Sequence, residues 1–158
     1  MTDQPPVIEI NNLHKAYGPL EVLKGVSVKA PRGHVISLIG SSGSGKSTLL
    51  RCCNLLEDSQ EGDLRFNGEA VTWKGTGHHR RPADPKQVLR IRTNLSMVFQ
   101  QFNLWAHMTI LQNVMEAPVT VLGRDRADVE ERARHYLDKV GIGDKCAAYP
   151  AQLSGGQQ

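Results

Sequence analysis

The eight residues Gly40, Ser41, Ser42, Gly43, Ser44, Gly45, Lys46 and Ser47 decide the fold of this chain. They fit the phosphate-loop pattern G-x-x-x-x-G-K-[ST] at every fixed position. Glycines let the backbone curl with positive φ, so that successive N–H groups face a bound anion. In this pattern the lysine meets the β and γ phosphates, and the following hydroxyl ligates Mg²⁺. We therefore expect the stretch from Gly40 to Thr48 to bind a nucleoside triphosphate.

The residues around this loop have the order that such a site requires. Residues 35–39 (Val-Ile-Ser-Leu-Ile) run directly into Gly40, and their apolar character indicates a buried parallel strand. Residues 47–56 follow with apolar residues at helical spacing. A strand, a glycine loop and a helix in this order place the N-terminus of the helix at the phosphates. The sequence thus predicts an α/β phosphate-loop NTPase core.

Composition is that of one globular domain. The chain has 158 residues, of which 39% are hydrophobic and 22% charged, and its formal net charge is +3. This mild charge suits a nucleotide or a membrane surface as partner but argues for neither one. No apolar run is long enough to cross a bilayer, and residues 1–6 do not have the pattern of a signal peptide, so we expect a cytosolic chain. The three cysteines form no C-x-x-C pair and are expected to be reduced, small apolar residues.

The residues before and after the loop predict an antiparallel layer beside the parallel one. Residues 7–10 alternate as in a strand, and residues 21–30 predict a second strand, with Gly25 at a turn or bulge. Residues 62–69 predict a short strand closed by an Asn-Gly turn. Pro31 to Gly33 predicts a turn.

The second half of the chain predicts one more strand and two helices. Residues 74–86 are expected to be mostly loop, and the run from His78 to Arg81 to be a solvated basic segment and not a metal or phosphate site. Residues 95–99 predict a strand. Thr109 is expected to cap a helix over residues 110–116, which Pro118 ends or bends, and a longer helix over residues 127–140 is expected to stop at Gly141.

A second motif stands at residues 153–157, Leu-Ser-Gly-Gly-Gln. Ser154 is a plausible helix N-cap, and the two glycines after it leave backbone N–H groups open at the start of a helix. These residues therefore predict a second anion-binding surface. A chain that holds both this motif and a phosphate loop is similar to the ATP-binding subunit of an ABC (ATP-binding cassette) transporter, and the resemblance covers residues 7–158.

This resemblance implies roles for particular residues. The signature residues Ser154, Gly155, Gly156 and Gln157 would contact the γ phosphate of ATP held by a second ATP-binding subunit in a dimer. Tyr17 would stack on the adenine ring, and Gln100 would reach Mg²⁺ or the attacking water, which makes Lys46 and Gln100 the expected catalytic residues and Ser47 and Gln100 the expected metal contacts. Residues 7–100 would form the catalytic core with a β subdomain, and residues 101–158 a helical subdomain.

A subfamily is also implied. Residues 97–109 and 113–118 are similar to importers of polar amino acids, especially the histidine and basic amino acid group. The implied partners are an integral membrane permease and, indirectly, a solute-binding protein, with no nucleic acid, at the cytoplasmic face of the membrane. Phe102 and Trp105 would suit docking to the permease, or equally the core of the helical subdomain.

The sequence also departs from the family pattern, because it holds no strand that ends in the Mg²⁺-ordering Asp and the catalytic Glu, and no switch His. We therefore expect residues 1–158 alone to hydrolyse ATP very slowly and to be marginally folded. A truncated, non-hydrolysing nucleotide-binding product remains an alternative. A soluble ABC ATPase outside transport is a further one.

Overall fold

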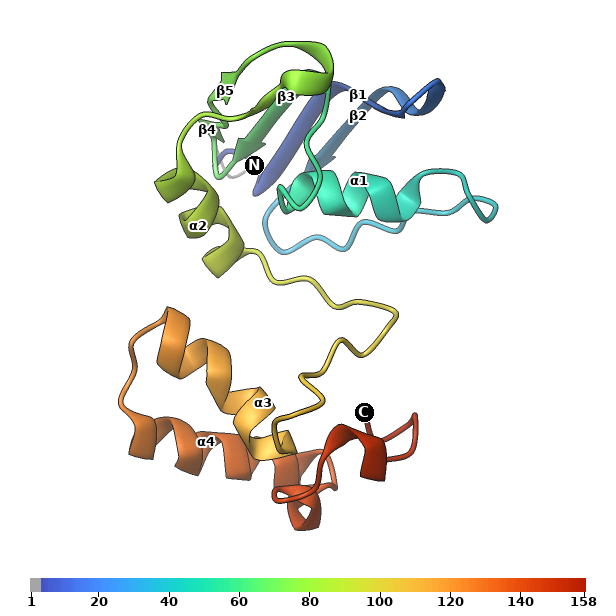
Figure 1. Ribbon diagram of the computed structural model, residues 1–158. Coiled ribbons are helices and arrows are strands. Elements are labelled where there is room, and N and C mark those ends of the chain that lie inside the picture. Colours follow the sequence, from blue (N-terminus) through green and yellow to red (C-terminus); the bar gives the residue numbers. More distant parts are fainter. Residues whose placement is uncertain (1–3) are drawn as a thin grey trace. The chain divides into compact units, whose positions relative to one another are not determined.

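The computed structural model describes residues 4–158 and divides the chain into two compact units, one ending at Met97 and one running from Val98 to Gln158. The first unit holds the sheet and two helices, and the second is helical (Figure 1).

An antiparallel sheet forms the first unit. Strands β1 (Ile8–Tyr17), β2 (Leu20–Ala30), β3 (Glu61–Phe66) and β4 (Glu69–Ala70) lie in the order β2-β1-β3-β4. This confirms the predicted antiparallel layer. The pairing of β1 with β2 skips Gly25, which has φ 74°, so the predicted irregularity there is a β-bulge. Asn67 and Gly68 both have positive φ, as a two-residue type I′ hairpin turn requires.

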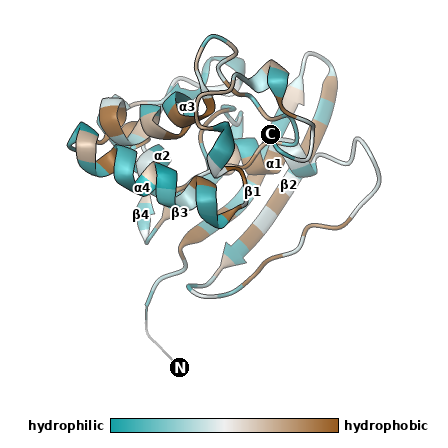
Figure 2. Ribbon diagram, turned by 90° about the horizontal axis from the view of Figure 1, so that it is seen from below, coloured by the Kyte–Doolittle hydropathy of each residue, from teal (hydrophilic) through white to brown (hydrophobic). Residues whose placement is uncertain are grey.

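The core of this unit lies between the sheet and two helices. Helix α1 (Lys46–Cys53) confirms the helix predicted after the glycine loop, and its buried residues Leu49 and Cys52 join a cluster with the inward residues of β1, β2 and β3, namely Ile10, Leu13, Leu23 and Leu64. Apolar and polar residues alternate over much of β2 in Figure 2, with a break at Val22 and Leu23. This alternation is what a strand with one buried face requires.

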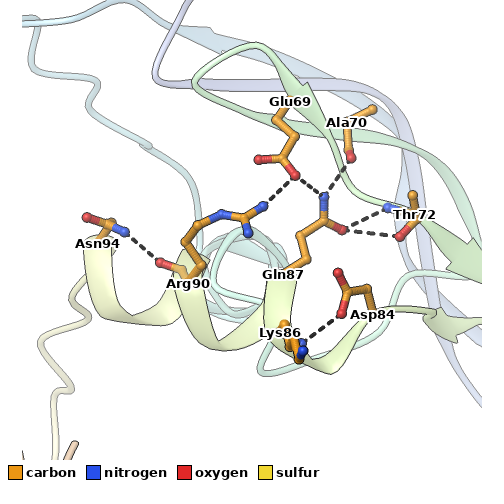
Figure 3. Close-up of polar contacts among 8 residues, drawn as sticks. All are labelled: Glu69, Ala70, Thr72, Asp84, Lys86, Gln87, Arg90 and Asn94. Atoms are coloured by element: carbon orange, nitrogen blue, oxygen red, sulfur yellow. Dashed lines mark hydrogen bonds and ion pairs between the residues drawn. The ribbon is translucent and has the colours of Figure 1, made fainter. Parts of the chain in front are cut away.

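Helix α2 (Pro85–Asn94) did not emerge from the sequence, although its start has clear signals. Asp84 caps it by accepting the Lys86 N–H at 2.8 Å, and Pro85 occupies the first helical position. The buried Gln87 amide accepts the Thr72 N–H at 3.0 Å and donates to the Ala70 carbonyl at 2.9 Å (Figure 3). This side chain therefore ties α2 to the end of the sheet.

The segment before α2 is more ordered than the predicted loop. It contains the paired strands β5 (Trp73–Lys74) and β6 (Arg81–Pro82) and the 3₁₀ turn Gly77–His79. Arg80 stacks on the Trp73 ring at 4.1 Å and donates to the Gly62 carbonyl at 2.6 Å. The prediction of a wholly solvated basic run is therefore wrong for Arg80, because an arginine beside an aromatic ring can pack through its planar face.

Two predicted strands are absent from the described residues. Residues 35–39 and 95–99 have no strand assignment, and Val35, Ile39 and Val98 are 92%, 95% and 96% exposed. The apolar composition of these segments signals a preference for burial, but a parallel strand also needs a hydrogen-bonding neighbour from elsewhere in the chain. Within residues 4–158 neither segment pairs with another strand.

The second unit is built on two helices joined by a π-helical turn. Helix α3 (Ile110–Glu116) begins with the predicted Thr109 cap, in which Gln112 completes a capping box. The π turn Ala117–Val121 contains Pro118, which confirms that the regular helix ends there. Helix α4 (Arg126–Lys139) stops before Gly141, whose φ is 79°. Short 3₁₀ turns follow at Gly143–Lys145 and Pro150–Gln152.

Candidate functional site: the phosphate loop

The glycine loop has the backbone conformation that its sequence predicts. Gly43 and Gly45 have φ of 78° and 90°, and Gly45 is the N-cap of α1. A Cβ atom at Gly45 would lie 3.0 Å from side-chain atoms of both Val22 and Leu23 on β2. Glycine at position 45 is thus required twice, by its left-handed conformation and by the close approach of the loop to β2.

The first turn of α1 presents free backbone donors. No side chain caps this helix, and its first turn has no acidic residue. In the part of the chain that the structure describes, no protein acceptor is bonded to the N–H groups of Lys46, Ser47 or Thr48. Free N–H groups and the positive end of the helix dipole together favour an anion. The residues present therefore fit the triphosphate that the sequence predicts.

Lys46 holds its charge inside the loop. Its ammonium donates to the carbonyl oxygens of Gly40 at 2.9 Å and Ser41 at 2.7 Å, and to the Ser44 hydroxyl at 3.2 Å. The Ser44 N–H also donates to the Ser41 carbonyl at 3.3 Å, which closes the loop into a tight turn. A positive charge is thereby fixed beside the free donors of α1, as phosphate binding requires.

Tyr17 lies at the last position of β1, where it pairs with Leu20 across the two-residue connection to β2. Gly45 touches β2 at Val22 and Leu23, only a few residues from that connection. The candidate adenine-stacking residue and the phosphate loop therefore belong to the same end of the β1–β2 hairpin. Tyr17 is accessible to a ligand, since 43% of its surface is exposed.

The remaining predicted site residues belong to the second unit. Gln100 is exposed in an irregular segment before α3. Residues 154–158 are exposed as well, and Leu153 anchors them by packing with Ile110 and Leu137. The phosphate loop belongs to the first unit.

The signature residues form one turn that begins at Ser154. The N–H groups of Gln157 and Gln158 donate to the Ser154 carbonyl at 2.8 and 3.1 Å, and the Gln157 side chain accepts the Ser154 N–H at 3.1 Å. The second of these backbone bonds has helical i to i+4 spacing, and the helix start predicted at Ser154 stays a prediction. The glutamine has taken the reaching-back role that the third residue plays in a capping box.

The described residues form neither a cluster of acidic, His or Cys side chains that could bind a metal ion nor a helix that could cross a membrane. Among residues 4–158, no three His, Cys, Asp or Glu side chains gather where they could hold a metal ion, and Cys52, Cys53 and Cys146 are free. None of the described helices combines the length and the apolar character needed to cross a bilayer. The Mg²⁺ contacts expected for Ser47 and Gln100 remain predictions.

Sequence reasoning missed two residues beside Tyr17. Lys15 is buried, and its ammonium lies 4.9 Å from the centre of the Tyr17 ring. Gln60 bonds the backbone of Ala16 on both sides, accepting the N–H at 2.8 Å and donating to the carbonyl at 3.3 Å. The period of two along a strand signals that Lys15 and Tyr17 share a face, but no local pattern marks Gln60.

Several known proteins are similar in sequence to this chain. The arginine/ornithine transport ATP-binding protein of Pseudomonas aeruginosa is 55% identical over 152 residues, which are 96% of this chain and 60% of that protein. The histidine transport ATP-binding protein of the same organism is 54% identical over 153 residues, with 96% and 60% coverage. The histidine/lysine/arginine/ornithine transport ATP-binding protein of Escherichia coli is 53% identical over 153 residues, again with 96% and 60% coverage. The chain thus spans about 60% of the length of these relatives.

Comparison with solved structures and with family models gives the fold and the family. The structure of cbiO1 from Clostridium perfringens, part of the ABC transporter complex cbiONQ, matches 97% of this chain and 57% of its own chain with a TM-score of 0.75 at 22% identity. The fold is therefore that of an ABC-type phosphate-loop ATPase, present in part. The model of the ABC transporter family matches residues 23–158, which include both the phosphate loop and the signature. With most of its length matched, the chain belongs to the ABC transporter family.

Proposed function

We propose that this chain is the ATP-binding part of a subunit that energises amino acid transport through a membrane permease, with polar or basic amino acids as the solutes. The observation that carries the proposal is the loop from Gly40 to Ser47, whose positive-φ glycines and Lys46 ammonium lie at the uncapped start of α1. The names of the similar proteins, which are transport ATP-binding proteins for arginine, ornithine, histidine and lysine, support the class of solute.

In this proposal the first unit binds the nucleotide. The free N–H groups of the loop and of α1 hold the phosphates, and Lys46 exchanges its bonds to loop carbonyls for bonds to the β and γ phosphate oxygens. Tyr17 stacks on the adenine. Mg²⁺, held with the help of Ser47 and Gln100, would neutralise charge that develops on the phosphoryl group.

The second unit would complete the site in the assembled protein. Ser154, Gly155, Gly156 and Gln157 would contact the γ phosphate bound to a second ATP-binding subunit, and Gln100 would orient the attacking water. The assembly would lie on the cytoplasmic face of the membrane, against the permease, which receives solute from a solute-binding protein. The exposed Phe102 and Trp105 belong to the irregular segment before α3 and are the candidate contacts with the permease.

Hydrolysis is a separate part of the proposal. Residues 1–158 contain the phosphate loop and the signature, but no strand that ends in an Asp-Glu pair. We therefore expect these residues by themselves to bind MgATP and to hydrolyse it very slowly, because phosphoryl transfer depends on the ordered metal and on the positioned water.

The test measures binding and transport in turn. Isothermal titration calorimetry on the full-length product of the gene is expected to show MgATP binding that Lys46→Ala abolishes or strongly weakens. Uptake of labelled arginine and histidine by cells is expected to fall when the gene is disrupted, while uptake of a neutral apolar amino acid is unchanged. Binding without any effect on uptake would favour a soluble ABC ATPase, and the absence of MgATP binding would refute the proposal.

A further inference from the structure

We propose that Lys15 is a positioning residue for the base of the nucleotide: its buried ammonium supports one face of the Tyr17 ring and keeps the ring ready to stack on adenine. This inference rests on the proposed function, because it deepens the role given to Tyr17. It concerns the recognition of the base and leaves the phosphate-binding loop unchanged.

The contacts of Lys15 account for its whole bonding capacity. Only 7% of the residue is exposed, and lysine is rarely buried to this extent unless it is paired. Its ammonium donates to the Asp58 carbonyl at 2.7 Å and meets the Glu57 carboxylate at 3.1 Å. The third direction faces the Tyr17 ring at 4.9 Å from its centre, which is within the range of a cation–π contact. The three N–H groups thus have two oxygen partners and one aromatic face.

The strand geometry explains why this lysine meets that tyrosine. Leu13, Lys15 and Tyr17 occupy alternate positions of β1, so they share one face of the strand. Leu13 lies in the core, and Lys15 continues the same row with a buried stem and a charged end. Tyr17 comes last in the row and keeps part of its surface open. One face of its ring is therefore supported while the residue remains accessible to a ligand.

The backbone beneath the ring is fixed by the same segment that fixes Lys15. Strand β3 begins only at Glu61, so its ladder with β1 does not reach Ala16. Gln60 extends it, since its main-chain N–H donates to the His14 carbonyl at 2.9 Å and its side-chain amide bonds both the N–H and the carbonyl of Ala16. Residues 57–60 thus hold both residues that precede Tyr17: Lys15 by its side chain and Ala16 by its backbone.

This arrangement lowers the cost of binding a base. A tyrosine on a strand end would otherwise lose rotamer freedom when a ligand orders it. A ring already held by Lys15 loses less, so more of the stacking energy remains for affinity. Residues 57–60 lie a few residues after the end of α1 at Cys53, so the chain connects the support of Tyr17 to the helix that begins at the phosphate loop.

The experiment compares two ligands, MgATP and inorganic triphosphate with Mg²⁺, by calorimetry on the full-length product of the gene. Inorganic triphosphate keeps the charge of the nucleotide but has no base. Tyr17→Ala is expected to weaken ATP binding about 5- to 100-fold, as loss of base stacking does. Lys15→Met is expected to weaken it about three- to tenfold and to leave binding of triphosphate unchanged. Lys29→Met is the matched control, because Lys29 pairs with Glu9 on the exposed side of the same sheet.

A double-mutant cycle separates positioning from folding. In a Tyr17→Ala background, Lys15→Met is expected to have no further effect on ATP affinity, because the ring that it positions is gone. The single change Lys15→Met leaves the Glu57 carboxylate without its partner, and the double variant Lys15→Met with Glu57→Gln removes that charge as well. The double variant must show the same loss of ATP affinity with unchanged triphosphate affinity. If Lys15→Met weakens the binding of both ligands equally, or still weakens ATP binding in the Tyr17→Ala background, Lys15 is only structural. If Tyr17→Ala leaves the preference for ATP over triphosphate unchanged, the role of Tyr17 fails as well, and if neither ligand binds the wild-type protein, the proposed function fails first.

Discussion

The ammonium of Lys46 donates a hydrogen bond of 2.7 Å to the carbonyl oxygen of Ser41, five residues before it in the chain. This bond, with the one to Gly40, keeps the positive charge at the N-terminus of α1, where backbone N–H groups are free. Carbonyl oxygens are weaker acceptors for an ammonium than phosphate oxygens, because they carry no formal charge. Under the proposed function, an arriving phosphate would replace these carbonyls with little movement of the charge.

Lys46→Ala is expected to reduce MgATP affinity by about ten- to a hundredfold or more, since hydrogen bonds to charged groups contribute about 1.5–3 kcal/mol each. Calorimetric titration measures the change. Lys24→Ala, on the exposed side of β2, serves as the control and should leave affinity unaltered. Equal affinities in the Lys46→Ala and wild-type proteins would show that the phosphates are bound elsewhere.

The two glycines of the loop are expected to respond differently to alanine. Gly43 has φ 78° with open space around it, so Gly43→Ala should cost only the backbone strain of about 1–2 kcal/mol. Gly45→Ala adds contacts of 3.0 Å with Val22 and Leu23 to similar strain and should cost about 1–3 kcal/mol more. Urea denaturation of both variants measures the difference in the free energy of unfolding, and equal losses would contradict the close packing of the loop on β2.

How much the sequence predicts depends on how local each signal is. The loop, α1, the Asn67–Gly68 hairpin and the Thr109 cap are correct because each is set by residues close together in the chain. The strands predicted at residues 35–39 and 95–99 are wrong for the described residues because a strand depends on a partner that local pattern does not supply.

The candidate site shows the same division. Eight consecutive residues predict the phosphate loop, and the positive φ of Gly43 and Gly45 agrees with the backbone curl expected there. The support of Tyr17 depends on two contacts, Ala16 with Gln60 and Lys15 with Glu57. The residues of each pair lie more than forty positions apart in the chain, so no sequence spacing predicts that they meet. The roles of Gln100, of residues 154–157 and of the two predicted subdomains stay predictions.

Asn113→Asp is expected to loosen the segment before α3. The Asn113 amide accepts the Trp105 N–H at 2.7 Å and donates to the carbonyls of Trp105, Met108 and Thr109 at 3.0–3.1 Å. Aspartate keeps the acceptor but turns a negative charge toward three carbonyl oxygens, which should cost about 1–3 kcal/mol.

Thermal unfolding followed by far-UV circular dichroism measures this loss. Asn94→Asp is the matched control, because Asn94 donates a single bond, to the Arg90 carbonyl at the exposed end of α2. The control should change the midpoint much less. A similar shift in both variants would mean that the Trp105 to Thr109 segment does not depend on Asn113.

The neighbouring thiols of α1 give a pH dependence with a definite sign. Burial raises the pKa of Cys52 from 9.0 to about 12, and burial also raises the pKa of Cys53 to about 11. Above pH 9 the unfolded chain therefore loses thiol protons that the folded chain retains. The stabilisation is complete below about pH 9 and is lost as the pH rises toward the folded-state pKa values, by at most about 1.4 kcal/mol per pH unit for each thiol. Denaturant titrations between pH 8 and about pH 10.5 should show this decline, and the variant Cys52→Ala with Cys53→Ala should decline less. An identical slope in wild type and variant would assign the alkaline loss to other groups.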